Sequence, residues 1–309
     1  MKNMKTDTIK EMSQSYTIHP DTKLGIVSLT VANLERQIEF YLKVLGLQLH
    51  WREGARAGLG VGSQDLIHLV EVPGARRAQA TTGIYHFALL LPNRRELARA
   101  IARLFQLRYP NYPTDHVVSK TTYLDDAEGN NIELYIYSSD EGTFTFENGQ
   151  LMVRRTDGRI SNGREALDVE ALFRELSPED DLHDSLPEET MMGHVHLYGA
   201  NLEDSMRFYR DVLGFKEGMI VPGFRFADVE LDRPHVIAFN TWQGEGAPPP
   251  PLDSLGLRYF TIVLPNRAEL EKVLARVREA GITTEDVEHG TLLRDPSQIS
   301  ILLTAEKTE

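Results

Sequence analysis

The sequence contains no cysteine among its 309 residues. Disulfides, thiolate nucleophiles and zinc sites of the cysteine type are therefore excluded, and any metal must be held by histidine and carboxylate side chains. Basic residues are also scarce, with 33 Lys and Arg against 46 Asp and Glu and a net charge of -13. This balance argues against binding to nucleic acid or to an anionic membrane surface.

Long apolar runs are absent as well, since none approaches the roughly 20 residues that cross a bilayer. The first twenty residues, MKNMKTDTIKEMSQSYTIHP, are polar and lack the apolar core of a secretory signal. We therefore expect residues 1–20 to form a disordered leader and the protein to be cytoplasmic, without nucleic-acid or membrane partners. The apolar content of 41% is ordinary for a globular protein.

Two segments of the chain repeat one pattern: GIVSLTVANLERQIEFYLKVLGL at 25–47 and GHVHLYGANLEDSMRFYRDVLGF at 193–215. Each pattern predicts a strand, then an Asn-Leu-Glu step, then an amphipathic helix with a core Phe-Tyr pair and a closing Val-Leu-Gly. The asparagines and the closing glycines are predicted to begin and end the helices: Asn33, Asn201, Gly46 and Gly214.

A second pair of segments follows the first, at 85–104 and 259–277. Each predicts a strand, a Pro-Asn turn, a helix and then further strands that meet at an acidic turn. The chain therefore consists of four βαβββ modules in the order A, B, A′, B′. We expect A and B to form a domain over 21–140 and A′ and B′ a domain over 191–305, with a linker carrying surface structure over 141–190.

Paired βαβββ modules with an FYxxVLG motif resemble the vicinal oxygen chelate superfamily of glyoxalase I, type I extradiol dioxygenases and bleomycin-resistance proteins. The resemblance covers about 20–305. The strings YHFALLLP (85–92), GHVHL (193–197) and NTWQGEGAPPPP (240–251) are most similar to bacterial catechol-2,3-dioxygenases. The resemblance implies an α+β fold in which four modules form two domains with curved mixed sheets. Because the superfamily hosts several reactions, the fold alone does not fix the chemistry.

Comparison of the four copies selects candidate metal ligands. In this superfamily the first strand of a module carries a ligand position, seven residues before the helix-capping asparagine. Aligning the copies on that asparagine gives Ile26, His86, His194 and Tyr259. Alignment of the last strands of B and B′ places Glu133, in a GN-x-I-E string that resembles the family's ligand carboxylate, opposite Leu302.

The surviving set is His86, Glu133 and His194. Two imidazoles and one carboxylate on one face of Fe(II) leave positions for substrate and O₂, and Mn(II) suits the same ligands. A single strand histidine is more often structural, and Glu133 could be a surface carboxylate on an edge strand. The equivalent repeat positions of the histidines favour ligation. The set requires modules B and A′ to share a cavity, and if B pairs with A instead, Ser28 or His68 would replace His194.

His116 and Tyr123 lie upstream of Glu133 in the chain. They resemble the catalytic His and Tyr of extradiol enzymes. The histidine could take a catechol proton or stabilise bound superoxide, and the tyrosine could hydrogen-bond the substrate oxygen. Module B′ has Leu292 where module B has Tyr123. The alternatives are a loop histidine beside Asp115 and a packed strand aromatic.

The remaining candidates lie in module A′ and are predicted to line the substrate pocket. His196 shares the strand face of His194. Its partners come from the last strand, HVIAFNTW: His235, Asn240 and Trp242. For Trp242, core packing is an equal alternative.

The resemblance therefore implies an Fe(II)-dependent extradiol dioxygenase whose substrates are a small aromatic diol and O₂; a homo-oligomer is compatible with this prediction. A metal-dependent lyase or isomerase of the glyoxalase type is the first alternative. Such enzymes usually show four protein ligands, whereas the last strand of A′ has no carboxylate. A metal-free binding protein is the second.

Overall fold

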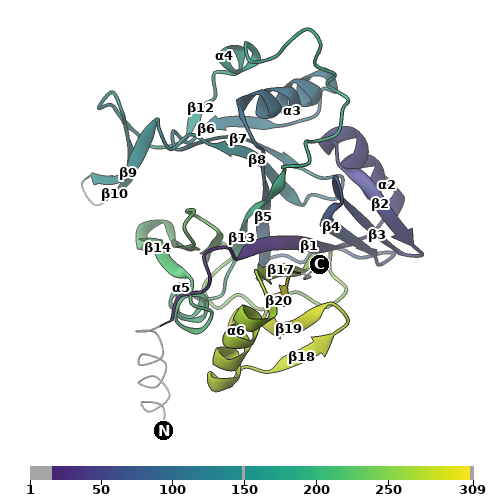
Figure 1. Ribbon diagram of the computed structural model, residues 1–309, viewed down its shortest axis with the longest axis vertical. Coiled ribbons are helices and arrows are strands. Elements are labelled where there is room, and N and C mark those ends of the chain that lie inside the picture. The colour runs from purple at the N-terminus through teal and green to yellow at the C-terminus, as the bar shows by residue number, and fades with distance from the viewer. Residues whose placement is uncertain (1–15, 148–149, 307–309) are drawn as a thin grey trace. The chain divides into compact units, whose positions relative to one another are not determined.

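The computed structural model describes residues 16–147 and 150–306. Its first half contains modules A and B (Figure 1). The elements of module A are β1 (Lys23–Val31), α2 (Leu34–Phe40) with its continuation η1 (Tyr41–Leu45), β2 (Gln48–Glu53), β3 (Arg56–Val61) and β4 (Gln64–Glu71). Those of module B are β5 (Gly83–Leu90), α3 (Arg94–Gln106), β6 (Tyr112–Asp115), β7 (Ser119–Asp125) and β8 (Asn131–Tyr137).

The second half contains two more modules of the same kind. Module A′ comprises β13 (Met191–Tyr198), α5 (Leu202–Met206) with η2 (Arg207–Val212), β14 (Lys216–Val221), the short turn η3 (Pro222–Phe224), β15 (Phe226–Glu230) and β16 (Ile237–Asn240). Module B′ comprises β17 (Gly256–Leu264), α6 (Arg267–Glu279), β18 (Thr284–Val287), β19 (Gly290–Arg294) and β20 (Ser300–Ala305). The predicted α+β class with four βαβββ modules is confirmed.

The order of the strands shows which modules share a sheet. A nine-stranded sheet runs β12-β6-β7-β8-β5-β13-β16-β15-β14 and therefore holds modules B and A′. An eight-stranded sheet runs β18-β19-β20-β17-β1-β4-β3-β2 and holds modules A and B′. The candidate ligand set requires module B to pair with module A′, and these two modules do share a sheet.

Contacts along the chain group it into two compact units. One consists of Met1–Thr30, Ala75–Tyr85 and His194–Glu309, and the other of Val31–Gly74 and His86–Gly193. The domain limits expected at 140 and 191 stay a prediction. In the described part of the chain, no helix is both long enough and apolar enough to cross a membrane.

Local sequence signals explain where the helices begin and end. The side chains of four asparagines each accept a hydrogen bond from the backbone three residues on: Asn33, Asn93, Asn201 and Asn266. The predicted glycines follow the helices of A and A′ in the left-handed region, with φ of 86° at Gly46 and 91° at Gly214. A Cβ on Gly214 would also lie 2.6 Å from the ring of Tyr16.

The expected leader is packed at its end. Residues 1–15 lie outside the described residues, but Ile18 is only 1% exposed and its backbone N–H donates to Gly214 O at 2.8 Å. The packed chain therefore includes residues that the sequence assigned to a disordered leader.

The expected linker also packs closely. The described part of 141–190 forms β9 (Gly142–Glu147), β10 (Gln150–Arg155), β11 (Ile160–Ser161), β12 (Glu165–Ala166) and a short helix, α4 (Val169–Phe173). The guanidinium of Arg103 in α3, 2% exposed, donates to the carbonyls of Leu182 and Asp184. Five hydrogen-bond donors in a fixed fork let one arginine fasten this segment to module B. Figure 1 shows the hairpin of β9 and β10 reaching out beyond β6 and β12.

Candidate metal centre and its surroundings

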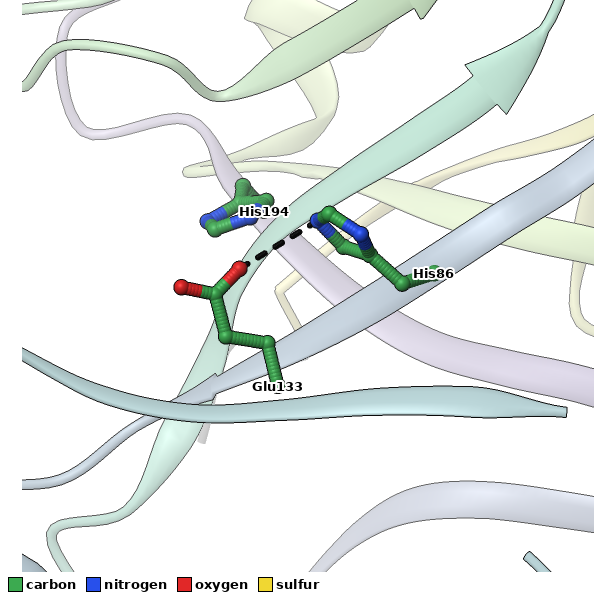
Figure 2. A group of neighbouring side chains, drawn as sticks. All are labelled: His86, Glu133 and His194. Atoms are coloured by element: carbon green, nitrogen blue, oxygen red, sulfur yellow. Dashed lines mark ion pairs between the residues drawn. The ribbon is translucent and has the colours of Figure 1, made fainter. Parts of the chain in front are cut away.

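Strands β5 and β8 lie next to each other in parallel register and bring two predicted ligands together. Ala88 is opposite Glu133 in this register, and His86 lies two residues earlier on β5. The Nε2 atom of His86 is 3.3 Å from Oε2 of Glu133, and the two side chains are 5% and 4% exposed (Figure 2). A carboxylate buried to this degree must be balanced by a cation or by strong donors, because its desolvation costs several kcal/mol.

The third predicted ligand, His194 on β13, is 5% exposed. One ligand atom from each of His86, Glu133 and His194 lies within 4.8 Å of the others. Figure 2 shows the two imidazoles and the carboxylate turned toward one another. No other group of three such side chains meets this distance within the residues that the structure describes. Two imidazoles and one carboxylate are a donor set that divalent Fe, Mn, Ni or Zn accepts, so these residues fit a metal ion.

The alternatives to His194 lie elsewhere. Ser28 is opposite Tyr259 in the register of β1 and β17. The Nε2 atom of His68 is hydrogen-bonded to Asp65 at 2.8 Å. Neither belongs to the three-residue group.

On the module B side, the predicted pair His116 and Tyr123 is joined. Tyr123 is opposite Glu133 in the register of β7 and β8, and its ring centroid is 5.7 Å from that of His86. The hydroxyl of Tyr123 is 3.0 Å from His116 Nε2. His116 Nδ1 in turn is 2.5 Å from the carbonyl oxygen of Gly163. The tyrosine therefore lies beside a candidate ligand and the histidine lies behind the tyrosine.

On the module A′ side, His235 is the residue that packs on a candidate ligand. Its ring centroid is 4.7 Å from that of His194. Its Nδ1 is 2.6 Å from Oδ2 of Asp228, and the side chain of Asp228 is only 2% exposed. His235 has φ of 57°, a conformation that non-glycine residues adopt uncommonly and that clusters at functional sites.

His196, Asn240 and Trp242 form a connected chain of hydrogen bonds. The backbone N–H of Trp242 donates to Asn240 Oδ1 at 2.9 Å, which assigns the other amide atom as nitrogen. Asn240 Nδ2 then donates to His196 Nε2 at 2.8 Å. A neutral His196 must therefore carry its proton on Nδ1. Asn240 is 0% exposed and Trp242 Nε1 donates to Phe224 O, so both groups are engaged within the protein.

Two groups in these surroundings were not predicted from the sequence. They are Asp228, which orients His235, and the carbonyl of Gly163, which holds His116. Asp228 lies in an alternating strand, FADVE, where nothing distinguishes it from a solvent-facing carboxylate. A backbone carbonyl carries no residue signal at all.

A family model described as the glyoxalase/bleomycin resistance protein/dioxygenase superfamily matches residues 23–134 and 191–300. The chain belongs to this superfamily. The two matched stretches contain the candidate ligands, His86 and Glu133 in the first and His194 in the second.

Relatives of this superfamily member support the same assignment. The chain is 37% identical over 284 residues to a protein of Bacillus subtilis (strain 168) named catechol-2,3-dioxygenase, covering 91% of this chain and 96% of that one. Glyoxalase I from Zea mays is similar in structure, with a TM-score of 0.54, 16% identity and coverage of 92% of both chains. The cppA protein from Streptococcus pneumoniae TIGR4 has a TM-score of 0.52, 12% identity and coverage of 94% and 98%. The two structural likenesses show the shared fold.

Proposed function

We propose that this protein is a metal-dependent extradiol dioxygenase that cleaves a catechol ring with O₂. The observation that carries the proposal is the buried group of His86, Glu133 and His194, in which one carboxylate and two imidazoles converge. The relative named catechol-2,3-dioxygenase, 37% identical over nearly the whole chain, supports it. In the proposed reaction the C–C bond beside one hydroxylated carbon breaks, and both oxygen atoms enter the ring-opened semialdehyde product.

His86, Glu133 and His194 would hold the metal, proposed to be Fe(II). When bound, Fe(II) supplies Lewis acidity toward the catechol oxygens and one-electron chemistry toward O₂. The protein contributes the burial of all three side chains at 5% exposure or less. Such burial keeps bulk water away from the reacting groups and strengthens their electrostatic interactions.

Tyr123 and His116 are proposed to take the proton of a substrate hydroxyl. Because the Gly163 carbonyl can only accept, His116 must carry a proton on Nδ1, which leaves Nε2 of the neutral ring as an acceptor. Tyr123 then donates its hydroxyl hydrogen to His116 Nε2, across 3.0 Å, and presents its oxygen as an acceptor to the substrate. A proton from the catechol can move to Tyr123 Oη as the tyrosine proton moves to His116 Nε2.

His235 is proposed to act beside His194. Asp228 accepts the Nδ1 proton of His235 and so leaves Nε2 of the neutral ring as an acceptor, the arrangement by which a carboxylate orients a general acid–base histidine. His196 is proposed to line the substrate pocket. Asn240 and Trp242, predicted as pocket residues, would serve by fixing the His196 ring, since their own polar groups are engaged.

Anaerobic loading with Fe(II), followed by an oxygen electrode assay with catechol and substituted catechols, tests the proposal. We expect one O₂ consumed per catechol and a yellow semialdehyde product. Mn(II) loading should be run in parallel because the same ligands accept it. No oxygen uptake with any catechol by fully loaded protein would refute the proposal.

The same preparations separate the alternatives. Tight binding of Ni(II) or Zn(II) without oxygen consumption would favour a lyase or isomerase of the glyoxalase type. Failure to bind any of these metals would favour a metal-free binding protein, and His86→Ala would then change nothing.

A further inference from the structure

The ring of His116 is held by a segment that the sequence assigned to a linker. Gly163 follows β11, and its carbonyl accepts from His116 Nδ1 at 2.5 Å. The Gly163 backbone is itself fixed, because its N–H donates to Ser161 Oγ at 2.9 Å. Gly163 has φ of 68°, which glycine adopts freely and other residues rarely do. The carbonyl is therefore aimed by the turn between β11 and β12.

The backbone beside His116 is in a conformation that needs support. Val117 has φ of 69°, an outlier for a β-branched residue, and its side chain is fully buried. Its N–H donates to Asp115 Oδ1 at 2.7 Å, and its carbonyl accepts from Ser138 Oγ at 2.6 Å. Strain of this kind persists only where surrounding contacts impose it. Those contacts hold the peptide on which His116 stands.

Charged groups tie the expected linker to this turn. Arg155, at the end of β10, donates to Asp115 Oδ2 at 3.1 Å and to Glu165 at 2.5 Å. Lys120, 3% exposed, donates to Asp115 Oδ1 and to Glu141 Oε2, each at 2.7 Å. Burial alone would raise the pKa of Asp115, but the donors Lys120, Val117 N–H and Arg155 outweigh it and keep that pKa below its ordinary value.

The packing of the segment is equally close on the apolar side. A Cβ on Gly142, the first residue of β9, would lie 2.7 Å from the Cγ1 atom of Val117. The hairpin therefore begins in direct contact with the strained residue.

We infer that residues 141–147 and 150–166 are a positioning element for His116. They fix its Nδ1–H tautomer through the Gly163 carbonyl and its place through Arg155 and Glu141. The inference rests on the proposed function for the consequence in catalysis. The tautomer of His116 is a structural property, and it can be tested without measuring any activity. Gly163 and Arg155 act through His116 and are positioning residues.

The tautomer can be read directly by two-bond ¹H–¹⁵N correlation of the imidazoles in the full chain loaded with diamagnetic Zn(II), with His116→Gln for assignment. We expect the neutral His116 to be protonated on Nδ1 alone in the unaltered protein. Arg155→Ala should give a mixture of both tautomers. Arg159→Ala is the matched control, because Arg159 lies in the turn between β10 and β11, is 75% exposed and pairs with Asp157. Its spectrum should not change.

Kinetics of the Fe(II)-loaded protein give the second readout. Arg155→Ala should lower kcat roughly tenfold, part of the 100-fold or more that a positioned acid–base group contributes, with little change in KM. Arg159→Ala should leave kcat unchanged. If Arg155→Ala does not fold, Ser161→Ala, which removes only the acceptor for Gly163 N–H, replaces it with the same two readouts.

An Nε2–H tautomer in the unaltered protein, or an unchanged spectrum in a folded Arg155→Ala protein, would overturn the inference. Absence of catechol cleavage in every sample would refute the proposed function, while the spectra would still decide the positioning of His116.

Discussion

Glu133 Oε2 and His86 Nε2 lie 3.3 Å apart in surroundings that leave each side chain 5% exposed or less. A buried carboxylate against an imidazole gains most when a cation joins them, because the cation offsets the desolvation of both. Loss of a residue that only hydrogen-bonds to a metal ligand typically costs roughly 10- to 100-fold in metal affinity. We therefore predict that Glu133→Ala, which removes a candidate ligand itself, reduces the affinity for Fe(II) by more than this. Metal content after equilibrium dialysis measures it.

His289→Ala is the control for this prediction, since His289 is 74% exposed in the turn before β19. It should bind metal as the unaltered protein does. Metal retention by both Glu133→Ala and His86→Ala at full occupancy would mean that these side chains are not ligands.

Asp228 gives a second prediction, because it fixes the proton of His235 on Nδ1. In Asp228→Asn the backbone N–H of Met219, which now donates to Oδ1, should keep the amide oxygen on its own side. The amide NH₂ would then face His235 Nδ1 and force the proton to Nε2. We expect kcat to fall roughly 100-fold while metal content stays constant.

Asp232→Asn is a suitable comparison, because Asp232 follows the same strand, is 69% exposed and pairs only with Lys216 among the described ion pairs. Steady-state kinetics and metal analysis on both variants decide the matter. Equal kcat values for the two would remove His235 from the proton chemistry.

The repeat made the two candidate ligand histidines predictable from the sequence. Copies of one module must bury the same positions, so a histidine at His86 and again at His194 stood out against Ile26 and Tyr259 at the equivalent places. The superfamily and the four-module fold were predicted and are confirmed by the family match. Helix limits were predictable because the capping asparagines act within three residues of the chain.

Other relationships have no local signal. Strand alternation tells which face of β5 is buried, but not that β13 will be its neighbour, because edge pairing depends on the whole sheet. The Phe-Tyr pairs were predicted as core, which their burial confirms, yet the hydroxyls of Tyr41 and Tyr209 also bond Asp126 and Asp295 far along the chain. The segment 141–190 has no second copy, so its contacts with module B could not be inferred by comparison.

Asp295 provides a prediction about stability. It is 2% exposed and accepts from Ser297 N, Ile299 N and the Tyr209 hydroxyl. Burial outweighs these bonds and raises its pKa from 3.8 to about 6. The folded state therefore binds the proton more tightly than the unfolded state, and stability falls as pH rises from about 4 to about 6. The shift corresponds to roughly 3 kcal/mol.

Asp295→Asn should remove this loss. Urea unfolding should be measured at intervals from pH 4 to pH 7. The free energy of unfolding of the variant should rise relative to that of the unaltered protein by about 3 kcal/mol as pH rises. Asp253→Asn, at an exposed turn, should show no such trend. A constant difference between Asp295→Asn and the unaltered protein across this range would mean that Asp295 does not titrate there.

Asp65 should behave in the opposite sense. It accepts from His50 Nδ1, Trp51 Nε1 and His68 Nε2, at 2.6, 2.6 and 2.8 Å. Burial alone would raise its pKa, but these donors outweigh burial and lower it from 3.8 to about 2. The folded state therefore releases the proton more readily, which contributes about 2 kcal/mol of stability above pH 4, lost as pH falls toward 2. The unfolding free energy of Asp65→Asn should lie below that of the unaltered protein at pH 6, with the gap narrowing between pH 4 and pH 3. A gap that widens on acidification would contradict the ionised Asp65 on which the three ring donors converge.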